Sequence, residues 1–267
     1  MSQPRTTSGR RALVTGASSG IGRAVAQVLA EAGYHVVLLA RRAEALESVR
    51  DELPGTGHRC LPCDLCDPES IAGAFAALEG DGLDLLVNNA GIGYRARVEE
   101  LEPSLLGQVF DTNVRGMLLT CKAALPLLRA GKRPVVVNIA SVVGRRGIPG
   151  QAAYSASKAA VCSIGEALRV EWAEEGIAVC TLNPALTATG FFDAQANPAG
   201  LPHPDLEGAV PSESVARHVL ELDQNPRREV SLRWKWRLLG MLSVLAPRLA
   251  DRMLVSRLGG SWRAPRW

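Results

Sequence analysis

The stretch that decides the fold is Thr15-Gly16-Ala17-Ser18-Ser19-Gly20-Ile21-Gly22. It joins a short apolar run at residues 11–15 to a segment with helical spacing at residues 21–32, which stops at Gly33. Glycines let the backbone turn tightly and let a pyrophosphate approach main-chain N–H groups, and a helix N-terminus adds partial positive charge. A glycine trio alone is weak evidence, but a strand before it and a helix after it predict a dinucleotide phosphate site.

Outward from this turn, strand-like and helix-like segments alternate along the chain. Apolar runs predict strands at residues 11–15, 35–40, 59–63, 83–88, 135–141, 177–183 and 229–232. Helical spacing predicts helices at residues 21–32, 43–53, 68–78, 105–129, 152–175 and 212–223. This alternation predicts the α/β class, with one doubly wound parallel sheet and no domain linker or internal repeat.

The end of the second predicted strand favours one dinucleotide over the other. An Asp or Glu at that place would bind a ribose 2′-hydroxyl and repel a 2′-phosphate. This chain has Ala40, Arg41 and Arg42 there. A guanidinium suits the extra phosphate, so NADP is predicted over NAD. The alternative is that both arginines belong to a solvated helix start.

The composition fits such a domain and excludes other classes of protein. Apolar residues make up 47% of the 267 residues and aromatic residues only 4%, as suits strands covered by helices on both faces. The polar start predicts no signal peptide, and no apolar run is long enough for a transmembrane helix. A cytoplasmic protein with free thiols is therefore expected. Cys60, Cys63 and Cys66 are spaced like metal ligands, but no second pair accompanies them, so no metal site is expected.

Further motifs follow the phosphate turn in order, and the whole set resembles the short-chain dehydrogenase/reductase family. The motifs are Asp64-Leu65, Asn88-Asn89-Ala90-Gly91, Asn113, Ser141, Tyr154-Ser155-Ala156-Ser157-Lys158 and Asn183-Pro184. A lone Tyr and Lys at this spacing arise often by chance, but the ordered set is specific. The resemblance covers residues 11 to about 189 and implies a Rossmann-like catalytic domain, which we place at residues 10–233.

The resemblance also implies which residues hold the cofactor. Asp64 and Leu65 are expected against the adenine, and residues 88–91 beneath the adenosine ribose. Lys158 and Tyr154 are expected to bond the nicotinamide ribose, and Thr189 the carboxamide. The expected cofactor-binding set is Gly16, Ser18, Ser19, Gly20, Ile21, Gly22, Arg41, Asp64, Leu65, Asn88, Ala90, Gly91, Tyr154, Lys158, Pro184 and Thr189.

The catalytic group can also be argued from the residues themselves. Tyr154 and Lys158 are four residues apart, so they share one face of a helix. A nearby ammonium is expected to lower the pKa of the tyrosine, so that Tyr154 can give a proton to a carbonyl oxygen or take one from an alcohol. Ser141, at the end of the fifth strand, is expected to hold the substrate oxygen. By resemblance, Asn113 anchors a water that supplies protons to the lysine.

The chain departs from the family pattern at Pro184-Ala185, where Pro-Gly is usual. The methyl group of Ala185 is expected to shift the nicotinamide slightly relative to Thr189. Residues 186–210 are expected to form a lid over the substrate, with Phe191 and Phe192 as an apolar wall. An apolar ketone, aldehyde, steroid-like or acyl-chain substrate would fit, and the sequence does not choose among them.

Residues 234–267 form a basic, Trp-rich extension. Residues 227–267 hold ten Lys or Arg against two Asp or Glu, and four of the five tryptophans. Helical spacing predicts two short amphipathic helices, at residues 234–246 and from Pro247 to residue 258. Such helices resemble interfacial membrane anchors. Packing over the substrate mouth or a partner subunit is an equal alternative.

The predicted function is hydride transfer between NADP(H) and a small apolar carbonyl or alcohol substrate, with Tyr154 as acid and base. By resemblance, a homodimer or homotetramer is expected through residues 105–129 and 152–175. No nucleic-acid motif accompanies the basic extension, so no nucleic-acid partner is expected. Two alternatives stay open: an NADP(H)-sensing regulator without turnover, and a membrane-surface binding protein peripheral on the inner membrane surface. The intact catalytic set argues against the regulator.

Overall fold

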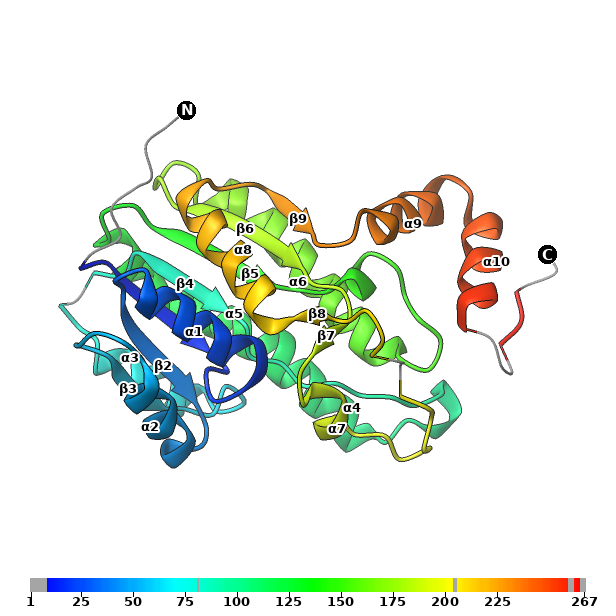
Figure 1. Ribbon diagram of the computed structural model, residues 1–267, viewed down its shortest axis with the longest axis horizontal. Helices are drawn as coiled ribbons and strands as arrows, with labels where there is room; N and C mark the ends of the chain where they lie inside the picture. The colour runs from blue at the N-terminus through cyan, green and yellow to red at the C-terminus, as the bar shows by residue number, and fades with distance from the viewer. Residues whose placement is uncertain (1–8, 81, 204–205, 259–261, 265–267) are drawn as a thin grey trace.

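The protein is built around one seven-stranded parallel sheet, ordered β3-β2-β1-β4-β5-β6-β9 (Figure 1). The computed structural model describes residues 9–80, 82–203, 206–258 and 262–264. The strands are β1 (Arg11–Thr15), β2 (His35–Ala40), β3 (Arg59–Pro62), β4 (Leu85–Asn88), β5 (Val135–Ile139), β6 (Ala178–Asn183) and β9 (Glu229–Ser231). The predicted α/β class with a doubly wound parallel sheet is confirmed.

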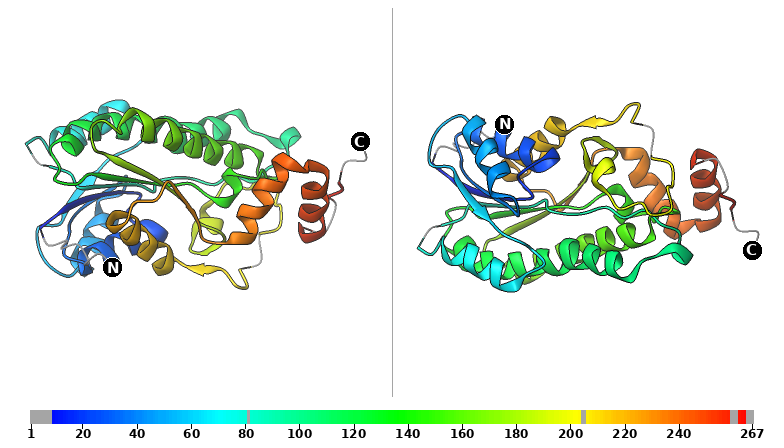
Figure 2. Two further views of the ribbon diagram at one scale, coloured as in Figure 1. Left: turned by 90° about the horizontal axis from the view of Figure 1, so that it is seen from above. Right: turned by 90° about the horizontal axis from the view of Figure 1, so that it is seen from below.

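Helices cover both faces of the sheet (Figure 2). One face carries α1 (Gly20–Glu31), α2 (Ala43–Glu52) and α8 (Ser212–Gln224), and the other carries α3 (Pro68–Ala76), α5 (Met117–Arg129) and α6 (Ala152–Glu171). Successive strand residues point to opposite faces. In β1, Ala12 and Val14 therefore pack under the first set of helices and Leu13 under the second.

The strand order places a crevice at the carboxyl end of the sheet. From β1 the chain runs outward through β2 and β3, then returns to β4 on the other side of β1. Ligands of open α/β sheets bind outside the carboxyl ends of the strands at such a reversal. The loops after β1, β4, β5 and β6 meet there, and they carry the motifs of the sequence.

The long helix predicted at residues 105–129 is interrupted. The structure has α4 (Pro103–Phe110), a π-helical turn η2 (Asp111–Gly116) and then α5. Proline suits the first position of a helix, which moves the start to Pro103. The wide turn contains Asn113, whose buried side chain bonds a loop distant in sequence.

The remaining short elements shape the rim of the crevice. They are η1 (Val98–Glu100), η3 (Val142–Gly144), β7 (Thr187–Ala188), α7 (Phe191–Ala194) and β8 (Val210–Pro211). β7 pairs with β8, which closes the loop expected to form the lid. The two helices predicted in the extension are confirmed as α9 (Trp234–Leu245) and α10 (Pro247–Leu258). No helix of the described residues is both long enough and apolar enough to cross a bilayer.

A buried polar cluster lies at the opposite, amino edge of the sheet. Arg10 donates through Nη2 to Asp223 Oδ1 at 2.8 Å, and Tyr34 donates to Asp223 Oδ2 at 2.6 Å. Asp84 accepts from the main chain of Arg11 and of Lys132, at 3.0 Å each. Burial first, and the bond to Asp223 second, raise the pKa of Tyr34. The cluster joins β1, β2, β4 and α8 across the bottom of the sheet.

Candidate active site

One cavity of about 780 Å³ occupies the crevice. Its walls come from the loops after β1, β2, β3, β4, β5 and β6, from α6 and α7, and from the two C-terminal helices. It runs from Arg41 and Arg42 at one end to Tyr154 and Ser141 further along. The motifs found in order along the sequence therefore surround a single space.

The phosphate turn needs glycine for two reasons. Gly16 and Gly20 have φ of +65° and +53°, which disfavour any side chain. A Cβ on Gly16 would also lie 2.9 Å from Ala90 Cα, and one on Gly22 would collide with the carbonyl oxygen of Gly16. Gly22 does not itself line the cavity, so its part is to let α1 approach the turn.

The start of α1 presents open hydrogen-bond donors to the cavity. Ser18, Ser19, Gly20 and Ile21 line it. The side chain of Ser19, at the N-cap position, accepts no hydrogen bond from the helix, and the first turn has no acidic residue. The helix dipole adds positive potential at the same place. Glycines that let a ligand approach and a free helix N-terminus are the features that a pyrophosphate requires.

Thr15 and Asn89 hold the turn after β1 against the turn after β4. Thr15 Oγ1 accepts from the main-chain N–H groups of Asn89 and Ala90, at 3.0 Å each. Asn89 Nδ2 donates to the Thr15 carbonyl at 2.9 Å. Asn89 also lines the cavity, although the sequence predicted no individual role for it.

The other end of the cavity is formed by the residues after β2 and β3. Ala40, Arg41 and Arg42 line it beside Asp64 and Leu65, as expected for an adenosine site. Both arginine side chains are exposed. Asp64 is held in place because its main-chain N–H donates to Ser70 Oγ at 3.0 Å and its Oδ1 accepts from Cys66 N, also at 3.0 Å. Cations without an acid at the end of β2 fit a 2′-phosphate.

Ser141, Tyr154 and Lys158 meet at the middle of the cavity, and all three line it. Ser141 follows β5 as the N-cap of η3, and its side chain shares a hydrogen bond with Tyr154. Tyr154 and Lys158 project from one face of α6, and Lys158 Nζ lies 5.9 Å from the centre of the Tyr154 ring. Lys158 is 5% exposed and donates to the Ile139 carbonyl at 2.9 Å.

Burial dominates the protonation of this pair. It raises the pKa of Tyr154 above its usual value, and the hydrogen bond from Ser141 opposes that rise. Burial also lowers the pKa of Lys158 to about 8. We expected the ammonium to lower the pKa of the tyrosine, and this expectation is wrong for the protein alone. Loss of water around the phenol outweighs the hydrogen bond from Ser141, so Tyr154 keeps its proton.

Asn113 lies behind the cavity wall and does not line the cavity. Its Oδ1 accepts from Ile92 N at 2.8 Å, and its Nδ2 donates to the Ile92 carbonyl and to Ser157 Oγ, both at 3.0 Å. A Cβ on Gly91 would lie 3.1 Å from Asn113 Oδ1 and 3.3 Å from Lys158 Nζ. Asn113 therefore positions the loop after β4 against α6. Its expected water remains a prediction.

Of the expected cofactor-binding set, all but two residues line the cavity. The residues that do are Gly16, Ser18, Ser19, Gly20, Ile21, Arg41, Asp64, Leu65, Ala90, Gly91, Tyr154, Lys158, Pro184 and Thr189. Gly22 and Asn88 do not. Asn88 ends β4 with its side chain in the core, where Nδ2 donates to Asn138 Oδ1 at 2.9 Å. Because strand residues alternate between faces, Asn88 and its neighbour Asn89 point different ways.

The substrate end is apolar. Phe191 packs on Tyr154 with 5.6 Å between ring centres, and Phe192 meets Phe191 edge-on. Both line the cavity, as do Val142, Val143 and Ile148 after β5. Trp236 of α9 and Leu258 of α10 also line the cavity, although the sequence did not predict this. Their helical spacing was visible, but nothing local shows that the end of the chain returns to the site.

Arg145 and Arg146 follow Ser141 and are absent from the cavity wall. Arg145 pairs with Glu166 and Glu229, at 2.6 Å each, and Arg146 pairs with Asp251 of α10 at 2.5 Å. Among the described residues, no cluster of His, Cys, Asp or Glu is arranged to hold a metal ion.

Comparisons with known proteins agree with this site. The chain matches the family described as short chain dehydrogenase over residues 10–199. Carbonyl reductase family member 4 of Danio rerio is 37% identical over 220 residues, which are 81% of this chain and 92% of that protein.

Two solved structures are similar to the chain. One is 3-ketoacyl-(acyl-carrier-protein) reductase from Brucella melitensis complexed with NADH, with a TM-score of 0.75 and 29% identity, covering 85% of this chain and 97% of that one. The other is a short chain dehydrogenase from Burkholderia cenocepacia J2315 in complex with NADP. It has a TM-score of 0.79 at 23% identity over 94% of this chain and 99% of that one, which shows the fold alone.

The matched family segment contains every motif quoted from the sequence, and the structure gathers those motifs around one cavity. A nicotinamide dinucleotide, NAD or NADP, is typical of proteins with this arrangement. The chain is therefore an oxidoreductase enzyme that belongs to the short-chain dehydrogenase/reductase family.

Proposed function

We propose that the protein is an NADP(H)-dependent reductase of apolar carbonyl compounds, with Tyr154 as proton donor. The observation that carries this proposal is the continuity of one cavity from two arginines, past the phosphate turn, to Tyr154 and an apolar end. An NADP(H) molecule in that space would have its 2′-phosphate near Arg41 and its pyrophosphate at the start of α1. Similarity to a carbonyl reductase supports a carbonyl substrate.

Each catalytic residue has a role that follows from its position. When bound, NADPH supplies the hydride. Ser141 donates a hydrogen bond to the substrate oxygen and orients it toward Tyr154. Tyr154 holds its proton because it is buried, so it donates to that oxygen as negative charge develops there. Lys158, fixed by the Ile139 carbonyl, places positive charge beside the phenol as its proton leaves.

The walls beyond Tyr154 support an apolar substrate. Phe191, Phe192, Val143 and Ile148 surround the space on several sides, and none of them offers a side-chain hydrogen bond. A polar group placed against these four side chains would lose its water without replacement, which costs binding free energy. Apolar ketones, aldehydes and acyl-chain carbonyls are the classes that fit.

The first test is NADPH consumption with a panel of apolar ketones, aldehydes and 3-ketoacyl esters. We expect Tyr154→Phe to reduce turnover by about a hundredfold or more, because general acid catalysis is lost. NADPH affinity, measured by fluorescence titration, should stay close to wild type, since the phosphate turn is untouched. Tyr94→Phe is the matched control, because that hydroxyl bonds only the main chain of Glu102 among the described residues.

Full turnover by Tyr154→Phe would contradict the mechanism. If wild type binds NADPH yet turns over no carbonyl in the panel, the NADP(H)-sensing alternative gains instead.

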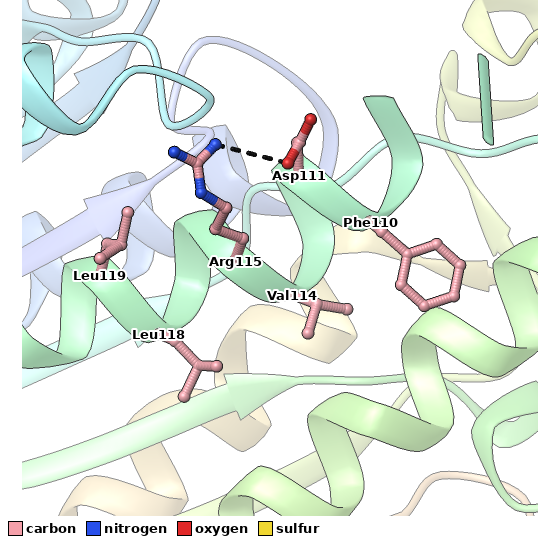
Figure 3. A pocket seen from close by; sticks show the side chains of 6 residues that line it. All are labelled: Phe110, Asp111, Val114, Arg115, Leu118 and Leu119. Carbon is pink, nitrogen blue, oxygen red and sulfur yellow. Dashed lines mark hydrogen bonds and ion pairs between the residues drawn. The ribbon is translucent and has the colours of Figure 1, made fainter. Parts of the chain in front are cut away.

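We also propose a homo-oligomer that forms through α4, α5 and α6. Figure 3 shows the groove on α4, η2 and α5, lined by Phe110, Asp111, Val114, Arg115, Leu118 and Leu119. Phe110 is 37% exposed and Leu118 is 42% exposed, and the 3.4 Å Arg115–Asp111 pair borders them. Exposed apolar side chains that share one helical surface mark a contact with another protein.

We further propose residues 10–233 as the catalytic domain and residues 234–267 as an extension that adds to it. The family match ends at residue 199, well before α9 begins at Trp234.

A further inference from the structure

The two C-terminal helices sit at one end of the molecule, beyond the edge of the sheet (Figures 1 and 2). Their inner side is packed on the protein. Leu239, Ala250 and Leu254 form a buried cluster with Ile148, and Val143 packs against it. Asp251 of α10 pairs with Arg146 at 2.5 Å. α9 and α10 therefore have a fixed orientation, and one side of each faces away from the protein.

The outer side of the helices is strongly apolar. Trp234, Leu238, Met241 and Leu245 repeat at helical spacing along α9 and are all exposed. Val244 is 82% exposed and Leu245 is 79% exposed. Leu249 and Leu258 extend the surface onto α10. A helix that is apolar on both sides is normally buried or in contact with lipid, and α9 has only one side covered by the described residues.

Basic side chains surround this apolar surface. Lys235 and Arg237 of α9 and Arg248, Arg252 and Arg257 of α10 are all exposed. Within the described part of the chain none of these five makes an ion pair. Asp251, the one acidic residue of the two helices, is already paired with Arg146. The outer surface of α9 and α10 therefore combines Trp and aliphatic groups with uncompensated positive charge.

We propose that this outer surface docks on an anionic phospholipid bilayer, with α9 and α10 lying in the interface. Apolar side chains enter the headgroup boundary while Lys and Arg contact lipid phosphates. A second copy of the chain is a poorer occupant. A symmetric contact brings the same patch of both copies together, which would set these cations against each other.

The same helices contribute to the wall of the cavity, so docking would place this part of the wall against the bilayer. Trp236 and Leu258 line the cavity, while Trp234 lies on the outer surface and Leu258 is 39% exposed. Leu258 therefore borders both the cavity and the outside. The consequence, which rests on the proposed function, is that apolar carbonyl substrates dissolved in the bilayer reach Tyr154 past α9 and α10.

Vesicle co-sedimentation of the full chain tests docking without any need for activity. Wild type should pellet with vesicles of equal parts phosphatidylglycerol and phosphatidylcholine and much less with phosphatidylcholine alone. Met241→Glu with Leu245→Glu should weaken binding to anionic vesicles by about tenfold or more, because two apolar side chains that enter the bilayer are replaced by acidic ones. Lys235→Glu with Arg237→Glu should weaken binding about as much.

Two matched variants control for the substitutions themselves. Val98→Glu replaces an apolar side chain of η1 that is 69% exposed with an acidic one. Arg217→Glu replaces an exposed basic side chain of α8 with an acidic one. Both should bind anionic vesicles like wild type. Light scattering without vesicles should show the same assembly for all variants.

The inference is overturned if wild type does not pellet with anionic vesicles or if both double variants pellet as wild type does. It is also overturned if the double variants dissociate an oligomer, since the surface would then belong to a second copy. The route is tested by NADPH oxidation with a long-chain ketone in vesicles and a short water-soluble ketone. The double variants should oxidise NADPH more slowly than wild type with the long-chain ketone in vesicles and at the same rate with the short ketone. Absence of turnover on both ketones would refute the proposed function while leaving docking intact.

Discussion

Burial is the largest cause of the pKa shifts of Tyr154 and Lys158. Each is most stable in its neutral form when water is removed. In the cofactor-free protein the phenol keeps its proton and the pKa of Lys158 falls to about 8. The site is thus prepared to donate a proton. Acceptance of a proton, as in alcohol oxidation, requires further positive charge near the phenol.

Replacement of Lys158 with Met should change how stability depends on pH. The pKa of Lys158 falls from 10.5 in the unfolded chain to about 8 in the folded protein. Between these values the unfolded chain holds the proton and the folded protein does not, so the free energy of unfolding rises with pH. Below about pH 8 the buried ammonium destabilises the fold in full.

Lys158→Met should therefore be more stable than wild type at pH 7, by roughly 3 kcal/mol if the whole shift counts. That advantage should shrink from pH 8 to 10.5. Urea unfolding of both proteins without cofactor, at several pH values, measures the difference. The contributions of the other titrating groups cancel in this difference because both proteins contain them. An advantage that stays constant with pH would show that the lysine is not desolvated as described.

The turn between β2 and α2 is the element that determines cofactor choice. Wild type should prefer NADPH to NADH because Arg41 and Arg42 line the adenosine end without an acid. Ala40→Asp with Arg41→Ala should shift the ratio of kcat/KM toward NADH on the order of a hundredfold, by adding repulsion and removing a charge-assisted hydrogen bond. Arg217→Glu on α8 changes the net charge by the same amount at an exposed site away from the cavity, and it should leave the ratio unchanged. A wild-type preference for NADH would refute the prediction that Arg41 and Arg42 bind a 2′-phosphate.

The elements that sequence predicts best are those with strong local causes. β1 and β2 begin and end where their buried apolar runs do, and the glycine turn follows from φ values that only glycine adopts freely. The break at Asn113 was missed because Asn113 is bonded there to Ile92, which lies in another loop. Trp236 and Leu258 were missed as lining residues because only the tertiary fold brings α9 and α10 to the cavity.

At the scale of the whole molecule, the polar cluster at the amino ends of the strands connects segments that are far apart in sequence. In that cluster Arg10 is 8% exposed and Asp223 fully buried, far apart in sequence. Asp223→Asn should lower the free energy of unfolding by about 3 kcal/mol or more, because it leaves a buried guanidinium without its full partner. Thermal or urea unfolding gives the value. A change below about 1 kcal/mol would mean that Asp84 and main-chain carbonyls suffice for Arg10.

Assembly also belongs to the scale of the molecule. Phe110→Glu with Leu118→Glu should reduce the molecular mass seen by light scattering, because it places acids in the groove on α4 and α5. Val244→Glu on α9 is the matched control and should leave the mass unchanged. If wild type is already a monomer at micromolar concentration, the proposed oligomer is wrong. If only Val244→Glu dissociates it, the contact lies at the C-terminal helices instead.

The way α9 and α10 meet the cavity has a consequence for how enzymes of this design diversify. Trp236 and Leu258 shape the substrate end, yet they lie outside the sheet that holds the phosphate turn and outside the helix that carries Tyr154. Substitutions there can alter which molecule is accepted without moving the reacting groups. Selection can therefore explore new substrates at the end of the chain while the chemistry stays constant.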